Sequence, residues 1–189
     1  VEKGSVVDPF RIEMSIPTIM ELRNKGAKVI LLSHIGRDPK ETLEPIMRYL
    51  QDSLPVVFIR DIFSPNAKKM IDYAAPGSVV VLENLRQHAG EEKNDPEFSK
   101  HLASFGDIYI NDSFPECHRA HASIVGITEF LPSFAGRQLM KEITNLSKTF
   151  ETNHPFLFIL GGAKVETKLP LINNFLDKDD NIFIGGILA

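Results

Sequence analysis

The sequence lacks three features that would each point to a large class of proteins. It has one cysteine, Cys117, so no internal disulfide can form and a reducing, cytoplasmic location is expected. No apolar run approaches the ~20 residues of a membrane-spanning helix, which argues against a membrane partner. The formal net charge of −4 argues against general nucleic-acid binding, for which a basic domain is expected. An anionic ligand would therefore need a local basic patch.

The composition is that of an ordinary globular protein. The chain has 189 residues, of which 43% are hydrophobic and 24% charged, enough for one sizeable core and part of a second domain. It starts at Val1 without Met and stops just as an apolar run reaches Gly185 and Gly186. Both ends look cut, so we expect a fragment of a longer protein.

Short apolar runs alternate with segments of helical spacing along the whole chain. Strands are predicted at residues 28–32, 56–59, 79–82, 108–110, 156–160 and 181–184. Helices are predicted from Ser15 to Gly26 and at residues 42–51, 64–74, 95–106, 121–130, 134–150 and 165–176, with a charged loop at 90–94. This alternation predicts a three-layer α/β/α fold with a parallel, Rossmann-like sheet. A domain boundary is placed between residues 150 and 151.

Basic groups follow four of the predicted strands. They are His34 with Arg37, then Arg86, then His118 with Arg119 and His121, and finally Lys164. The carboxyl ends of parallel strands share one edge of a sheet, so these groups are expected to converge there and to bind a phosphate or carboxylate. Each has an ordinary alternative: a hydrogen-bonded structural histidine, a helix cap for Arg37, or an ion pair between Arg86 and Glu83.

A glycine-rich turn follows the strand at 156–160. Gly161 and Gly162 would let a ligand approach the backbone, and Lys164 and Lys168 lie one helical turn apart, as a polyphosphate site would need. The spacing is not that of a P-loop, and a turn with a solvated helix face explains it equally well. No His and Cys residues have zinc spacing, so no metal ligand is predicted within the chain.

Five segments together resemble the phosphoglycerate kinase family. In chain order they are KGAKVILLSHIGR at 25–37, LENLR at 82–86, NDSF at 111–114, HRAHAS at 118–123 and LGGAKV at 160–165. They follow the family's order and cover nearly the whole chain. Individually some are common, but jointly they are highly specific.

The resemblance implies a two-lobed glycolytic kinase that reversibly transfers phosphate between 1,3-bisphosphoglycerate and ADP, giving 3-phosphoglycerate and ATP. Residues 1–150 would be the substrate domain, and residues 151–189 the hinge and the start of the nucleotide domain, which takes Mg²⁺ with ATP or ADP. The implied magnesium ligand lies beyond Ala189, and the full-length protein is expected to be a monomer. The implied substrate-binding residues are Arg11, His34, Arg37, Arg86 and Arg119. The implied catalytic residues are Arg11 and Lys168, and the implied nucleotide-binding residues are Gly162, Ala163, Lys164, Lys168, Gly185 and Gly186.

Four departures from the family pattern leave alternatives open. The family's first strand, with its Asp-Phe-Asn motif, is not present before Val1, Pro115 stands where a glycine is usual, and Ile187 replaces the third of three glycines. Gly136 is followed by Arg137 rather than an apolar residue. We expect the chain alone to be inactive. The alternatives are a non-catalytic relative that binds a phosphorylated acid or a protein, and an unrelated phosphosugar-binding α/β protein, which would not explain the ordered motifs.

Overall fold

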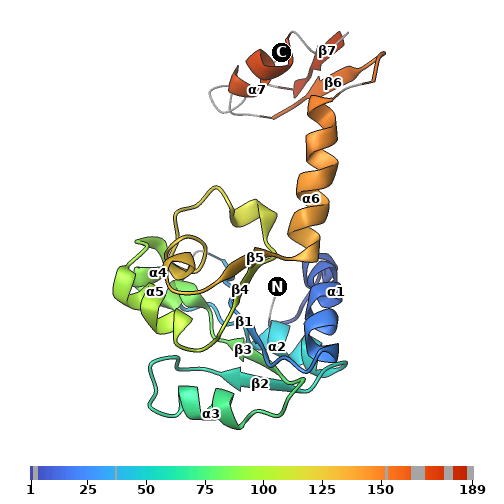
Figure 1. The fold of residues 1–189 in the computed structure, drawn as a ribbon. Helices are drawn as coiled ribbons and strands as arrows, with labels where there is room; N and C mark the ends of the chain where they lie inside the picture. Colours follow the sequence, from blue (N-terminus) through green and yellow to red (C-terminus); the bar gives the residue numbers. More distant parts are fainter. Residues whose placement is uncertain (2–3, 37, 152, 163–168, 177–180, 187–189) are drawn as a thin grey trace. The chain divides into compact units, whose positions relative to one another are not determined.

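A computed structural model describes the chain except for residues 2–3, 37, 152, 163–168, 177–180 and 187–189 (Figure 1). The chain divides into two compact units, Val1–Met140 and Lys141–Ala189. The division lies inside helix α6 (Arg137–Ser147), about ten residues before the domain boundary expected from the sequence. Within the described ranges, none of the helices combines the length and the apolar character that crossing a bilayer requires.

The first unit is built on a three-stranded parallel sheet. Strands β1 (Val29–Leu31), β2 (Val56–Ile59) and β3 (Val79–Leu82) pair in the order β1-β3-β2, with Val29 and Val56 both opposite Val79. All four residues of the central strand β3 are buried. Strands covered on both faces have continuous apolar sequences, and this is why all three were recognisable from the sequence.

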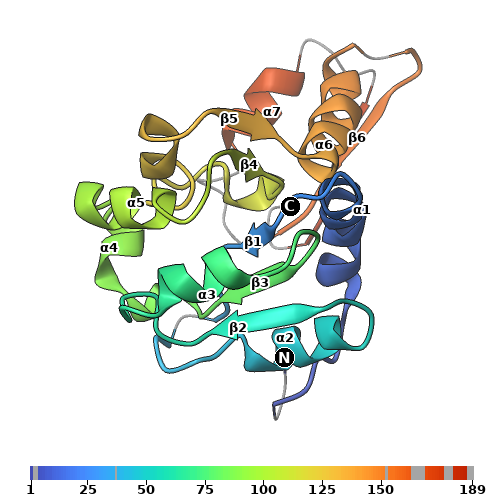
Figure 2. The ribbon, with the colours of Figure 1, turned by 60° about the horizontal axis from the view of Figure 1, so that its bottom comes forward.

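Helices cover both faces of this sheet (Figure 2). Val79 and Val81 of β3 face a core formed with α1 (Phe10–Asn24) and α2 (Glu44–Gln51). Val80 and Leu82 face the opposite core, which includes residues of α3 (Ala67–Tyr73) and α5 (Pro96–Ala103). Side chains alternate between the two faces of a strand, so β3 supplies both cores. The predicted three-layer α/β/α arrangement is confirmed for this unit.

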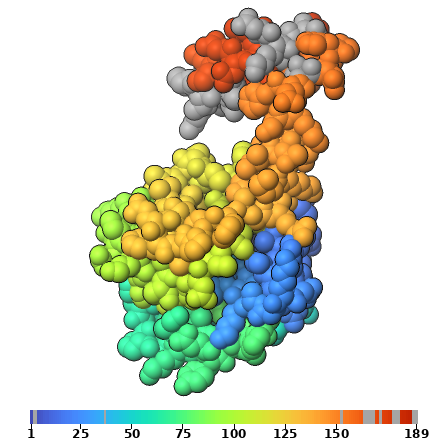
Figure 3. All heavy atoms as spheres, in the orientation of Figure 1, coloured from blue at the N-terminus to red at the C-terminus, as the bar shows by residue number. Residues whose placement is uncertain are grey.

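Long-range hydrogen bonds hold the segments at the amino ends of these strands. Lys28 Nζ donates to the carbonyl of Asp72 at 2.6 Å, and Arg23 Nε donates to the carbonyl of Gly77 at 2.8 Å. The space-filling view shows the corresponding blue and green segments lying side by side on the visible face of the unit (Figure 3). These contacts lie at the end of the sheet opposite to the loops in which basic groups were predicted to converge.

The remaining elements of the first unit lie after β3. They are η1 (Leu85–Gln87), α4 (Ala89–Glu92), β4 (Tyr109–Asn111), η2 (Phe114–Glu116), η3 (Gly126–Glu129) and β5 (Ser133–Ala135). Strands β4 and β5 form a separate parallel pair.

The second unit has one parallel strand pair and a small aromatic core. Strand β6 (Leu157–Leu160) pairs with β7 (Asn181–Ile184), and the described helical segments are η4 (Lys148–Phe150) and α7 (Leu169–Phe175), together with the last part of α6. The buried Phe175 stacks with Phe150, Phe156 and Phe158, at 4.6 Å between ring centroids in the last pair.

Two predicted helix boundaries are confirmed in atomic detail. Gly26 ends α1 with φ +84°, and the N–H of Ala27 donates back to the carbonyl of Leu22 at 3.1 Å, as in a Schellman motif. Asp95 caps α5 by accepting a hydrogen bond from the Phe98 N–H at 2.8 Å.

Two predicted helix starts are wrong. Helix α1 begins at Phe10, because Asp8 already accepts the Phe10 N–H at 2.9 Å, and Ser15 lies inside the helix and donates to the carbonyl of Ile12. The helix expected from Ser64 begins at Ala67 instead.

Three further segments differ from the prediction. The helix expected at 134–150 is preceded by strand β5, and it begins at Arg137. The helix expected at 121–130 is only the 3-10 turn η3, and the expected loop at 90–94 contains most of the helical turn α4.

We expect Leu82→Ala to lower the free energy of unfolding by about 2–5 kcal/mol, because Leu82 is fully buried beneath α3 and α5 and truncation leaves a cavity. Urea denaturation of the purified chain measures this. The control is Tyr73→Ala, which removes a side chain that is 88% exposed and should change stability by less than about 0.5 kcal/mol. Equal effects of the two substitutions would contradict the assigned core.

Candidate functional site

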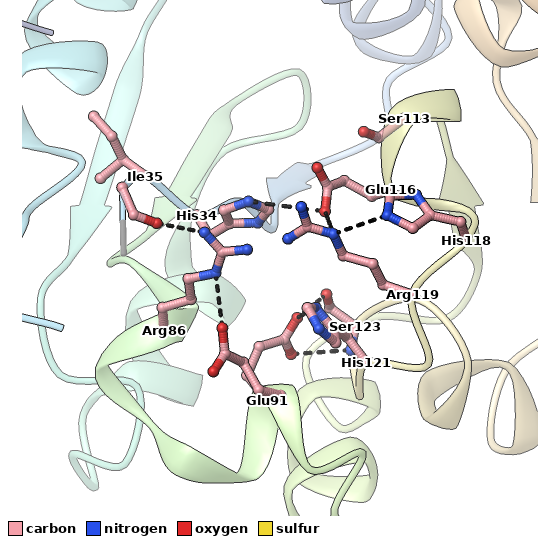
Figure 4. Close-up of polar contacts among 12 residues, drawn as sticks. His34, Ile35, Arg86, Glu91, Ser113, Glu116, His118, Arg119, His121 and Ser123 are labelled. Atoms are coloured by element: carbon pink, nitrogen blue, oxygen red, sulfur yellow. Dashed lines mark hydrogen bonds and ion pairs between the residues drawn. The ribbon is translucent and has the colours of Figure 1, made fainter. Parts of the chain in front are cut away.

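Three loops that leave the carboxyl ends of β1, β3 and β4 meet at one place in the first unit. Figure 4 shows His34 from the first loop, Arg86 from the second, and Arg119 and His121 from the third directed toward a common region. We call these four side chains the basic cluster. The three loops are far apart in the sequence, and the third leaves a strand of the separate β4–β5 pair, so contacts between the loops must hold their basic groups together.

Two buried residues at the end of β3 hold the first two loops against each other. The Asn84 side chain accepts the N–H groups of Ile35 and Arg86 at 3.3 and 3.2 Å, and donates to the carbonyls of Ile35 and Glu41 at 3.1 and 2.9 Å. The Glu83 carboxylate accepts the Leu43 N–H at 2.7 Å. Because its carboxylate is engaged there, Glu83 is not the partner of Arg86. The alternative that Arg86 serves only as an ion-pair partner of Glu83 is therefore excluded.

A buried carboxylate holds the third loop. Glu91, 1% exposed, accepts hydrogen bonds from the Ser123 hydroxyl at 2.5 Å and the Ser123 N–H at 3.1 Å, and it lies 3.8 Å from Nδ1 of His121. Its backbone carbonyl accepts the Ala122 N–H at 2.9 Å. Burial raises the pKa of the Glu91 carboxyl, and the Ser123 hydrogen bonds oppose that rise.

Both arginines of the basic cluster already face carboxylates. Arg86 Nε lies 3.3 Å from Glu92, and Arg86 also donates to the carbonyl of Gly36. Arg119 Nε lies 3.2 Å from Glu116 and 3.4 Å from the His118 ring. An anionic ligand would exchange these intramolecular pairs for contacts with its own oxygens.

The pKa of His34 depends on its burial and on the charges of the neighbouring side chains. Burial lowers the pKa of His34 below its usual 6.5, and the nearby positive charge of Arg86 lowers it further. Arg119 and His121 act in the same direction, and Glu116 opposes them. His34 is therefore neutral at pH 7 and can donate or accept one hydrogen bond at each ring nitrogen, according to its tautomer.

The loop after β4 also anchors helix α6. Asp112 Oδ1 accepts the N–H groups of Gln138 and Leu139 at 2.8 and 3.1 Å. A Cβ at Gly136 would lie 2.1 Å from the same oxygen, so this approach requires glycine.

The structure brings some of the sequence-predicted residues together and not others. His34, Arg86 and Arg119 converge, whereas Arg11 lies exposed in the first turn of α1, where no hydrogen bond or ion pair joins it to the described part of the cluster. Arg37 lies outside the described residues.

The predicted nucleotide-binding glycines lie in the second unit. Leu160 is opposite Ile184 in the β6–β7 pair, and the Gly185 N–H donates to the Leu160 carbonyl at 2.9 Å, so the two glycine loops start side by side. Gly162 and Gly186 have φ +138° and +71°. Ala163, Lys164 and Lys168 lie outside the described residues.

Sequence reasoning missed the acidic and amide residues of the site. From the sequence, Glu91 is expected in a charged loop at residues 90–94, and Glu116 is not singled out. The available signal for Glu83 and Asn84 was their place directly after a buried strand. Among the described residues, no group of three or more His, Cys, Asp or Glu side chains is arranged to hold a metal ion.

We expect Glu91→Ala to destabilise the chain by about 1–3 kcal/mol, because it leaves the Ser123 hydroxyl and N–H without their acceptor. Urea unfolding measures the loss, and hydrogen exchange should quicken at Ser123. Glu92→Ala is the matched control, since that side chain is 61% exposed and its ion pair contributes about 0–1 kcal/mol. Unchanged exchange at Ser123 in Glu91→Ala would rule out the assigned role.

Comparisons with known proteins agree with this architecture. The phosphoglycerate kinase family model matches residues 1–189. Phosphoglycerate kinases from Methylorubrum extorquens (strain PA1) and Pseudothermotoga lettingae are each 46% identical, over 100% and 98% of this chain and 49% of their own length. The solved phosphoglycerate kinases of Coxiella burnetii and Pyrococcus horikoshii OT3 superpose with TM-scores of 0.84 and 0.89 at 33% identity, covering 98% and 100% of this chain and 48% and 50% of theirs.

The chain thus spans about half the length of the curated relatives it matches. The ordered motifs, the parallel α/β fold and the family match all agree, and the chain belongs to the phosphoglycerate kinase family.

Proposed function

We propose that the basic cluster binds 3-phosphoglycerate, as part of a phosphoglycerate kinase. The observation that carries the proposal is the convergence of His34, Arg86 and Arg119 from three separate loops in a chain of this family. 3-Phosphoglycerate carries a carboxylate and a phosphate. Arginine binds either group through a planar pair of N–H donors, and a neutral histidine adds one hydrogen bond.

The reaction proposed for the whole protein is reversible phosphoryl transfer between 1,3-bisphosphoglycerate and ADP in glycolysis, in the cytoplasm, by a monomer. Its chemistry needs positioning and charge stabilisation rather than a protein nucleophile. We assign Arg11 and Arg37 to the substrate and Arg11 and Lys168 to the transferring phosphoryl group. Mg²⁺ with the nucleotide would neutralise phosphate charge, and the chain alone is proposed to be inactive.

The second unit is proposed to begin the nucleotide site. Gly162 and Gly185 with Gly186 start neighbouring loops at one edge of the β6–β7 pair, where backbone can approach a ligand closely. We also assign Ala163, Lys164 and Lys168 to the nucleotide site, and this assignment rests on the sequence motif alone.

A non-catalytic relative that binds a phosphorylated acid is the second candidate. The observation that favours it is Glu116, whose carboxylate is paired with Arg119 inside the basic cluster. Such a protein would keep the anion site and lack turnover in its full-length form.

Calorimetric titration of 3-phosphoglycerate into the chain tests the first proposal, with unphosphorylated glycerate as the ligand control. We expect selective binding that Arg119→Ala weakens by about 10- to 100-fold, the loss expected for charge-assisted hydrogen bonds. Arg48→Ala is the matched control, because Arg48 is 67% exposed on α2. Equal binding of the two ligands, or no effect of Arg119→Ala, would count against the proposal.

A further inference from the structure

Glu116 places a negative charge inside the basic cluster. It ends the short turn η2, and its Oε2 atom lies 3.2 Å from Arg119 Nε and 3.9 Å from His34 Nε2. Figure 4 shows the Glu116 carboxylate beside the Arg119 guanidinium, on the side that faces His34.

This carboxylate is enclosed but poorly hydrogen-bonded. Glu116 Oε2 is buried and has no well-directed hydrogen bond within the described chain, although its side chain lies against Arg119. A buried carboxylate oxygen without hydrogen bonds is costly, so the positive charge of Arg119, 3.2 Å away, must hold it there.

Arg86, the second arginine of the basic cluster, has a more exposed carboxylate partner than Arg119. Glu92 lies 3.3 Å from Arg86 Nε, but its side chain is 61% exposed, against 19% for Glu116. An exposed carboxylate such as that of Glu92 is readily exchanged for water and ligand, whereas the more enclosed carboxylate of Glu116 resists exchange.

The loop can release the carboxylate without unfolding. The turn is held by backbone hydrogen bonds, from the Glu116 N–H to the Ser113 carbonyl at 3.2 Å and from the Arg119 N–H to the Glu116 carbonyl at 3.0 Å. Rotation of the Glu116 side chain breaks neither of them.

We propose that Glu116 is an affinity-determining residue that competes internally with anionic ligands for Arg119 and His34. An incoming phosphate or carboxylate displaces it, and the site therefore binds anions more weakly than its basic groups alone would allow. The identity of the natural ligand rests on the proposed function, but the competition applies equally to inorganic phosphate.

The test is calorimetric titration of inorganic phosphate into the wild-type chain and Glu116→Gln, which keeps the shape of the side chain and removes its charge. We expect the variant to bind phosphate about tenfold more tightly or better. Glu129→Gln, at an exposed position of η3, is the charge-matched control and should bind like the wild type. Glu116→Ala serves as a second substitution if the first does not fold.

The inference would be overturned if Glu116→Gln bound phosphate no more tightly than the wild-type chain does. It would also be overturned if neither protein bound phosphate detectably. NMR titration supplies a ligand-free check: Glu116 raises the pKa of His34, so the substitution should lower it. The titrations of the wild-type chain with 3-phosphoglycerate and glycerate test the proposed function separately. If those two ligands bound equally, the proposed function would fail, but tighter phosphate binding by Glu116→Gln would still uphold the inference.

Discussion

The site depends on the buried end of strand β3. Glu83 and Asn84 directly follow this strand, which is buried along its whole length, and their side chains hold the loop after β1 against the loop that carries Arg86. Glu91 extends the same support to the loop after β4 through Ser123. Three loops that are distant in sequence therefore share one rigid support, and precise positioning of charged side chains follows from it.

Electrostatics explains how an acidic chain can present a basic site. The formal net charge is −4, yet Arg86, Arg119, His34 and His121 lie together, and their carboxylate partners are Glu91, Glu92 and Glu116. These carboxylates limit the repulsion between the cations when no ligand is bound. The three carboxylates differ in solvent exposure, so an incoming anion displaces some of them more easily than others. This difference sets how strongly the cluster attracts an anion.

The sequence predicted the sheet and the basic cluster better than the small elements around them. Residues 56–59 and 79–82 were predicted to the residue, because strands buried on both faces have continuous apolar runs. Strand β5 was missed because its three residues are exposed and its pairing with β4 is non-local. The convergence of His34, Arg86 and Arg119 was predicted from the ends of parallel strands, although β4 pairs with β5 and does not join the β1-β3-β2 sheet. No pattern identifies which of the 25 acidic residues turn inward, so Glu91 and Glu116 were missed.

The central claim is that three separate loops form one anion site. The most direct test is a two-dimensional NMR titration of the isotope-labelled chain with 3-phosphoglycerate, following the backbone amides of residues 33–36, 84–86 and 118–123. The account predicts that all three segments shift together with a single dissociation constant. Shifts confined to one segment, or different constants for different segments, would contradict it.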